Sequence, residues 1–269
     1  MTSQERLNEL LAKAARKYRA LNADLQTFAI AEIDRTRLEL IDMLNEYADK
    51  DGTIAKARLN SLLRDLEAIE KAVRKNGMAA LEEVVRKSAE AGTMAGETAL
   101  VGALGESVAL GVAFNRLNAE VFRYVVNRFG EDGLVLSDRV WNLAGDQRDA
   151  LNRVIRSGII RGESVNQLIA QVRRVYNNET WKIRRLVVTE GNTAYRVATA
   201  YRAQRSDVVR GLRIHRGRAN RPEHRCTQLE LADKHGLGAG IYLPSDTEIY
   251  NPHANCTSYL TYELIEEVR

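Results

Sequence analysis

The residues best suited to chemistry are cysteines and histidines that lie close together near the C-terminal end of the sequence. In 269 residues the chain has only two cysteines and four histidines. One His/Cys pair lies in the stretch PEHRC and another in NPHANC. Zn²⁺ is bound tetrahedrally by thiolate and imidazole groups of this kind. The sequence therefore predicts four candidate zinc ligands, Cys226, His253, Cys256 and His224, and His235 between the two stretches is a further candidate.

This Cys/His cluster allows three interpretations. A zinc ion could hold together a C-terminal module that is too small to be stable without one. His253 and the two thiols could instead pack and hydrogen-bond in a small core that holds no metal. A disulfide between Cys226 and Cys256 is the third interpretation, but the N-terminal sequence MTSQERLNELL predicts no signal peptide, and an unsecreted chain normally stays reduced.

The sequence gives little support for catalysis. It contains no Gly-rich phosphate loop, no Ser-centred elbow and no recognisable motif of paired carboxylates. We therefore expect a protein that is not an enzyme. The alternative is a zinc-dependent nuclease or another DNA-processing enzyme with the Cys/His cluster at its centre, which would need an open zinc position and a nearby general base.

The first part of the chain, residues 1–130, is predicted to be a helical region. Leucine and isoleucine recur at helical spacing, with a break at DKDGT (49–53). A helix from about Ile54 is expected to end at KNG (75–77), and helical spacing resumes up to Gly130. The stretch 98–117 is interrupted by Glu106 and rich in small residues, so we expect a closely packed helix hairpin, or a segment that meets lipid or a partner helix, and no membrane span.

A second helical region, 137–207, is predicted to hold two short helices separated by RGES and a long one from about Glu179 to Arg205. Ser137 with Asp138 and, further on, Ser164 are the expected N-caps.

Residues 208–269 change in character. Alternation in RGLRIHRGR, in the stretch after GLGAG and in CTSYLTYELI predicts about three strands. The predicted fold class is α+β and predominantly α, with a long N-terminal helical region followed by a small C-terminal β-rich module that carries the Cys/His turns.

Positive charge is concentrated in the middle of the chain. The formal net charge is +4, but residues 151–225 carry 17 Lys and Arg against 5 Asp and Glu, a net charge of +12. Such an asymmetry is typical of a surface that faces nucleic acid or an acidic protein, although solvated helix faces would give the same count.

Arginine side chains can neutralise phosphates without reading base sequence, so DNA binding would be non-specific and would weaken as salt rises. The candidate nucleic-acid-binding residues are Arg173, Arg174, Lys182, Arg184 and Arg185, with a second group at Arg213, Arg216, Arg218 and Arg221. Pairing of these side chains with acidic patches of a partner protein is the alternative.

Four segments over about residues 137–265 follow one another in an informative order. They are SDRVWNLAGDQRDALNRVIRSGIIRGESVNQLIAQVRR, RRLVVTEGNTAYRVATAYRAQRSD, GLRIHRGRANRPEHRCTQLELADKHG and YNPHANCTSYLTYEL. In this order they resemble the head-morphogenesis, or minor capsid, family of tailed bacteriophages, the phage Mu F-like proteins. Leu229 and Ser258 stand where that family usually has further cysteines, which leaves Cys226, His253 and Cys256 as the matching positions and His224 as a substitute ligand.

The resemblance implies a virion component rather than a metabolic enzyme. Proteins of this family are minor head proteins present in a few copies at the portal vertex and the inner face of the shell, with roles in head morphogenesis and in DNA packaging or ejection. The implied partners are the portal protein, the major capsid protein and phage double-stranded DNA. The implied location is the capsid interior or portal vertex, with the host cytoplasm during assembly.

Overall fold

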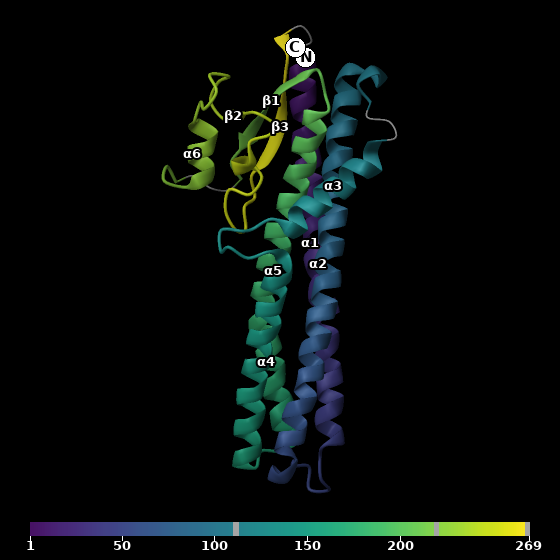
Figure 1. The fold of residues 1–269 in the computed structure, drawn as a ribbon, viewed down its shortest axis with the longest axis vertical. Coiled ribbons are helices and arrows are strands. Elements are labelled where there is room, and N and C mark those ends of the chain that lie inside the picture. The colour runs from purple at the N-terminus through teal and green to yellow at the C-terminus, as the bar shows by residue number, and fades with distance from the viewer. Residues whose placement is uncertain (110–112, 218–220, 267–269) are drawn as a thin grey trace.

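The computed structural model of the chain describes residues 1–109, 113–217 and 221–266. Helices make up most of this part of the chain, and a three-stranded antiparallel sheet lies near the C-terminal end (Figure 1). The predicted fold class, α+β and predominantly α, is confirmed.

Four long helices form an elongated bundle: α1 (Ser3–Glu46), α2 (Leu59–Leu104), α4 (Leu136–Arg161) and α5 (Val165–Gln204). A shorter helix, α3 (Phe114–Asn127), packs against α2 and α5. Apolar side chains that recur at helical spacing are buried in one continuous core. Because α5 contacts each of the other four helices, it is the element best placed to connect the bundle to a site.

The end of the bundle remote from the sheet is closed by two loops that touch (Figure 1). One loop carries the 3-10 helix η1 (Lys56–Arg58), and the Gly52 carbonyl in it accepts a hydrogen bond from the Val165 amide at 2.8 Å. The other loop ends at Ser164, whose hydroxyl accepts from the Gln167 amide and caps α5. The predicted N-cap role of Ser164 is confirmed.

Helix α2 passes straight through Gly77, so the predicted helix end at KNG is wrong. A Cβ atom built on Gly77 would lie 3.3 Å from the Val140 side chain of α4, and the residue is buried. Glycine in a helix interior costs about 1 kcal/mol relative to alanine. Here its small size lets α4 approach α2, and this packing outweighs the glycine's helix-breaking tendency.

The predicted helix start near Glu179 is also wrong, because α5 is one uninterrupted helix. Buried Val175, Tyr176 and Ile183 keep the helical spacing across the polar stretch that suggested a break. At the start of α4 the N-cap position belongs to Val135. Asp138 lies three residues further on and accepts from the Val135 amide at 3.4 Å, so it supports the helix start without being the predicted cap.

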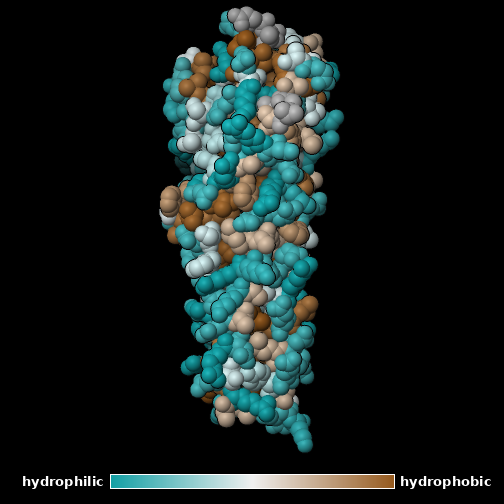
Figure 2. All heavy atoms as spheres, turned by 45° about the vertical axis from the view of Figure 1, so that its right-hand side comes forward, coloured by the Kyte–Doolittle hydropathy of each residue, from teal (hydrophilic) through white to brown (hydrophobic). Residues whose placement is uncertain are grey.

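The stretch 98–117 contains the end of α2, the 3-10 helix η2 (Glu106–Val108) and the start of α3, which packs back on α2. Residues 110–112 of this stretch lie outside the described part. None of the described helices is both long enough and apolar enough to cross a membrane. Figure 2 shows a face that is hydrophilic over much of its length, with hydrophobic side chains gathered in a band near its middle.

The sheet has the strand order β2-β1-β3 and consists of β1 (Val209–His215), β2 (Ile241–Tyr242) and β3 (Tyr259–Leu264). Both pairings are antiparallel, and Leu212 in the central strand lies opposite Tyr242 on one side and Tyr262 on the other. These three side chains are buried and join the core of the bundle.

Two features of this module were not expected from the sequence. Helix α6 (Arg225–Leu231) lies between β1 and β2, and the 3-10 helix η4 (Thr247–Ile249) lies between β2 and β3. In addition, the side-chain amide of Gln4 donates to the Tyr262 carbonyl at 2.7 Å and accepts from the Leu264 amide at 2.9 Å. The first turn of α1 therefore occupies the free edge of β3.

Candidate functional site

Polar side chains on one stretch of α5 hold the loop that carries NPHANC. The Thr189 hydroxyl accepts a hydrogen bond from the Asn255 amide at 3.1 Å and donates to the Arg185 carbonyl at 2.7 Å. One turn further along, the Asn192 side chain donates to the Cys256 carbonyl at 2.6 Å. The position of Cys256 is thus set by α5.

Arg196 extends this contact from a position that is only 1% exposed. Its guanidinium donates to the carbonyls of Tyr250 and Ser258, at 2.7 and 3.0 Å. Its Nη2 atom is buried and has no hydrogen-bond partner among the described residues. Because backbone carbonyls carry no net charge, Arg196 brings a buried positive charge close to the sulfur of Cys256.

The predicted cysteine and histidine ligands come together beside this loop. The Cys226 sulfur lies 3.1 Å from Nε2 of His253 and 3.4 Å from the Cys256 sulfur. The Cys256 sulfur lies 2.9 Å from the Ser258 hydroxyl. Both thiols are free and buried, and 3.4 Å is well beyond the S–S bond length of about 2.05 Å, so the structure holds them as a dithiol.

The two histidines of the cluster differ in which ring nitrogen is available. Nδ1 of His253 lies 2.7 Å from the Ala254 carbonyl, which can only accept, so this nitrogen carries the proton and Nε2 presents a lone pair to Cys226. Nδ1 of His224 accepts from the Cys226 amide at 3.2 Å as the N-cap of α6, so in the neutral ring the proton is on Nε2. His253 is therefore ready to bind a metal, whereas His224 must first give up its cap or change tautomer.

Hydrogen bonding and charge shift the proton affinities within this cluster. The hydrogen bond from Cys226 lowers the pKa of the Cys256 thiol to about 3, with help from Arg196, His253 and Ser258. The pKa of Cys226 is raised, because its proton is shared with Cys256 and the thiol is buried. The Cys256 sulfur raises the pKa of His253. These directions place negative charge on Cys256 and the shared proton on Cys226.

The ligand atoms of His224, Cys226 and His253 lie within 4.8 Å of one another, so this group could hold a metal ion. Cys256 touches the group through its contact with Cys226. His235, the further candidate, lies elsewhere and pairs with Asp246 at 2.7 Å.

The predicted nucleic-acid-binding residues divide into exposed and paired ones. Lys182 pairs with Asp146 and Glu179 at 2.9 and 2.7 Å. Arg213 pairs with Glu263, and Arg216 with Glu230. The remaining described members of the set are exposed and form no ion pair with another described residue: Arg173, Arg174, Arg184, Arg185 and Arg221. Arg218 lies outside the described residues.

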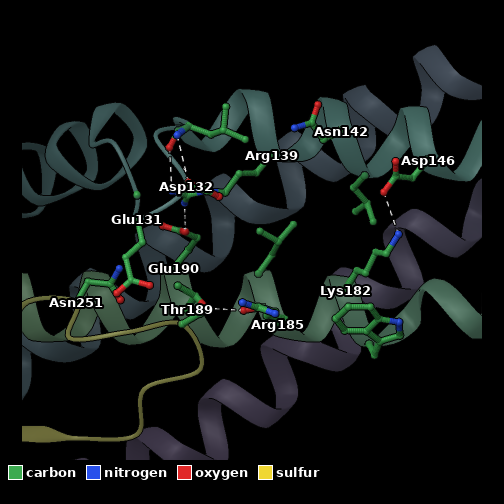
Figure 3. A pocket seen from close by; sticks show the side chains of 16 residues that line it. Glu131, Asp132, Arg139, Asn142, Asp146, Lys182, Arg185, Thr189, Glu190 and Asn251 are labelled. Carbon is green, nitrogen blue, oxygen red and sulfur yellow. Dashed lines mark hydrogen bonds and ion pairs between the residues drawn. The ribbon is translucent and has the colours of Figure 1, made fainter. Parts of the chain in front are cut away.

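A cavity of about 300 Å³ opens between α4 and α5 and is bounded at one end by the loop before α4 and by residues 251 and 254 (Figure 3). Most charged groups around it are paired with each other. Glu190, which is 0% exposed, accepts from Arg128 at 2.7 Å and from Arg139 at 2.5 Å. Arg139 also binds Asp132 at 3.0 Å. This buried network connects the loop before α4 to α5, beside the residues that hold NPHANC.

Sequence reasoning missed the buried network, Arg196 and the cavity as parts of a site. One signal was present: in TEGNTAYRVATAYRA, charged Glu190 and Arg196 stand among alanine, threonine and glycine in a helix. A charged residue on such a small-residue face is expected to be buried and paired.

Comparisons with protein-family models, curated proteins and solved structures find no match for this chain.

Proposed function

We propose that this chain is a minor head protein of a tailed bacteriophage, similar to the phage Mu F-like proteins. In this role it is a virion component at the portal vertex, bound to the portal or major capsid protein, and acts in head morphogenesis and in DNA packaging or ejection. Its role is structural rather than enzymatic.

One observation carries this proposal: the segments that resemble that family meet at one place in the fold. Thr189, Asn192 and Arg196 of the TEGNTAYR segment bind the backbone of the YNPHANC segment, 54 to 66 residues away. Cys226 of the third segment contacts His253 of the fourth at 3.1 Å. This convergence supports the proposal, because it places the segments that resemble the family around one site.

The proposal is tested by asking whether the chain is present in particles. Mass spectrometry of purified phage heads should detect it at a few copies per particle, and a tagged chain should co-purify with the portal protein from cells producing heads. Its absence from particles, together with no retention of portal or major capsid protein, would overturn the proposal.

We further propose that the Cys/His cluster holds a structural zinc ion through Cys226, Cys256 and His253, with His224 as fourth ligand. In a tetrahedral zinc site a sulfur and a nitrogen ligand lie about 3.6 Å apart and two sulfurs about 3.8 Å apart. The observed separations of the Cys226 sulfur from His253 Nε2 and from the Cys256 sulfur are 3.1 and 3.4 Å, so these two pairs reach zinc geometry after moving apart by about 0.4–0.5 Å. The ion would tie α6 to the loop that α5 holds.

Metal analysis tests the zinc site directly. Protein purified without added metal should contain close to one zinc per chain, and Cys226→Ser and Cys256→Ser should each remove it. His224→Ala should weaken zinc binding less, because its ring already caps α6. His235→Ala is the control, since His235 binds Asp246 outside the cluster. If both cysteine variants retain zinc, the proposed zinc site is refuted. If the wild type cleaves DNA and folded His253→Ala does not, the alternative function, a zinc-dependent nuclease, is favoured.

The exposed arginines of α5 are proposed to contact DNA phosphates. Each phosphate contact contributes about 0.9 to the slope of log affinity against log salt, so glutamine at four arginines should lower that slope by roughly 3–4. The variant replaces Arg173, Arg174, Arg184 and Arg185, and its equal-charge control replaces exposed Arg16, Lys17, Arg64 and Lys71. If the two variants have equal slopes of log affinity against log salt on random duplex DNA, the DNA contact lies elsewhere. If the wild type does not bind DNA even at low salt, the basic surface must instead bind a protein partner.

A further inference from the structure

An exposed tryptophan stands among the free arginines of α5. Trp181 is 56% exposed, although large aromatic side chains are usually buried. Arg174, Asn178, Trp181 and Arg185 are spaced by four, three and four residues, so they share one face of the helix. The two arginines lie about 16 Å apart along the helix axis, with the indole between them. Arginines on such a face can bind the phosphates of a duplex, but the exposed indole adds nothing to that contact.

Trp181 also lines the cavity between α4 and α5, together with Arg185, which is labelled in Figure 3. Its walls combine apolar side chains of Leu134, Leu143 and Leu186 with amide and carboxylate groups. A volume of about 300 Å³ is at the small end of the range for ligand pockets. An aromatic plane beside a small, partly polar hollow suits a flat heterocycle with hydrogen-bonding edges.

Several polar groups around this cavity have no partner among the described residues. The side-chain oxygen Oδ1 of Asn251 is buried and has no hydrogen-bond partner among the described residues. Asn142, Glu131 and the Arg185 guanidinium line the cavity and form no side-chain hydrogen bond or ion pair with another described residue. By contrast, Asp146 and Lys182 at the other end neutralise each other. The unpaired set contains a cation for a phosphate, and amide and carboxylate groups that match the edge of a base.

We infer that this surface binds single-stranded nucleic acid, with an unpaired base stacked on Trp181 at the mouth of the cavity and phosphates on Arg174 and Arg185. The inference rests on the DNA contact of the proposed function and specifies its ligand. Bases in a duplex are stacked on each other, so only an unpaired base can use the indole face. Glu131 beside the cavity repels a phosphate but accepts from the amino group of a base, which orients the strand with its backbone toward the arginines.

Tryptophan fluorescence reports stacking directly, because the chain has only two tryptophans. Trp141 is the other one; it is 57% exposed, lies under the Arg74 guanidinium and does not line the cavity. In the Trp141→Phe variant all tryptophan emission comes from Trp181. A single-stranded oligonucleotide of mixed sequence should quench it, and the same sequence as a blunt duplex should not. Equal quenching by both would overturn the inference.

Affinity measurements at fixed salt test the same point. Stacking of one base is worth about 1–3 kcal/mol, so Trp181→Ala should weaken single-strand binding by about 5- to 150-fold. Trp181→Phe should retain most of the affinity, and Trp141→Ala should retain all of it. Duplex binding should be the same in all three variants.

The outcomes separate this inference from the proposed function. If Trp181→Ala leaves single-strand affinity unchanged while the fourfold arginine variant weakens both ligands equally, the stacking site is refuted and the electrostatic DNA contact stands. If the wild type binds neither single-stranded nor duplex DNA at low salt, both the stacking site and the electrostatic DNA contact are refuted. If free mononucleotides bind tightly and longer oligonucleotides bind no more tightly, the ligand is a nucleotide rather than a strand, and the inference is refuted.

Discussion

Replacing Glu190 with glutamine should destabilise the protein far more than replacing an exposed carboxylate. Glu190 is 0% exposed and is the shared acceptor of Arg128 and Arg139, whose side chains are 8% and 10% exposed. In the Glu190→Gln variant Arg139 keeps Asp132 and the Leu134 carbonyl. Arg128 loses its ion pair, and its Nε atom is already buried without a partner among the described residues.

The magnitude follows from this one stranded cation. Removing one partner of a buried ion pair costs about 3–5 kcal/mol. For a chain of this size each kcal/mol lowers the melting temperature by about 2–4 °C, so the expected decrease is roughly 6–20 °C. The control is Glu82→Gln, because Glu82 forms a partly exposed pair with Arg86 at 3.9 Å, and this pair should contribute less than about 0.5 kcal/mol.

Urea unfolding followed by circular dichroism gives both free energies. Combining Glu190→Gln with Arg128→Met should recover part of the loss, because the stranded charge is then removed. Two results would show that the network is not a charge-compensated unit. One is a loss of unfolding free energy in Glu190→Gln no larger than that in Glu82→Gln. The other is a loss in the double variant larger than the sum of the losses in the two single variants.

Two other substitutions test how α5 is held. Gly92→Ala should lower the free energy of unfolding by about 1–3 kcal/mol, because the added Cβ would lie 2.4 Å from the Tyr195 carbonyl oxygen. Gly145→Ala on α4 is the control: its Cβ would meet nothing within 4 Å, so it should stabilise the protein by up to about 1 kcal/mol. Equal effects in urea unfolding would contradict the close α2–α5 contact. Arg196→Lys keeps the charge but cannot reach two carbonyls with one fork, so we expect a loss of about 1–3 kcal/mol and faster amide exchange across residues 250–258. Unchanged exchange there would show that Arg196 does not hold the loop.

The sequence predicts the helices and strands well where periodicity is strong and poorly where it relies on helix-breaking residues. Strand patterns at 209–215 and 259–264 and the cap at Ser164 are found in the structure. Gly77 and the polar stretch before Glu179 suggested breaks because local propensity favours them. Contacts with Val140 and with the buried face of α5 decide otherwise, and such contacts between distant helices are not visible in a local pattern.

The candidate metal residues could be proposed from residue type alone, and the structure brings His224, Cys226 and His253 together, with Cys256 in contact with Cys226. The sequence could not show that His253 is ready to bind a metal and His224 is not. That difference depends on Nδ1 of His253, which lies against the Ala254 carbonyl, and on Nδ1 of His224, which caps α6. For the arginines, residue type identified the basic region but not which charges are free. Arg213 is paired with Glu263, 50 residues further along, and Arg216 with Glu230, 14 residues further along, and only the folded chain reveals these partners.

The contact between Gln4 and β3 bears on how the chain folds during synthesis. Gln4 and Tyr262 are 258 residues apart, and at a translation rate of about 5–20 residues per second the first turn of α1 waits roughly ten to fifty seconds for the strand it borders. A contact of such long sequence separation forms late, because closing so large a loop costs entropy that few local interactions offset. Until Tyr262 and its neighbours have been synthesised, the nascent bundle therefore lacks β3, and the edge of β1 that later pairs with β3 is open to other chains.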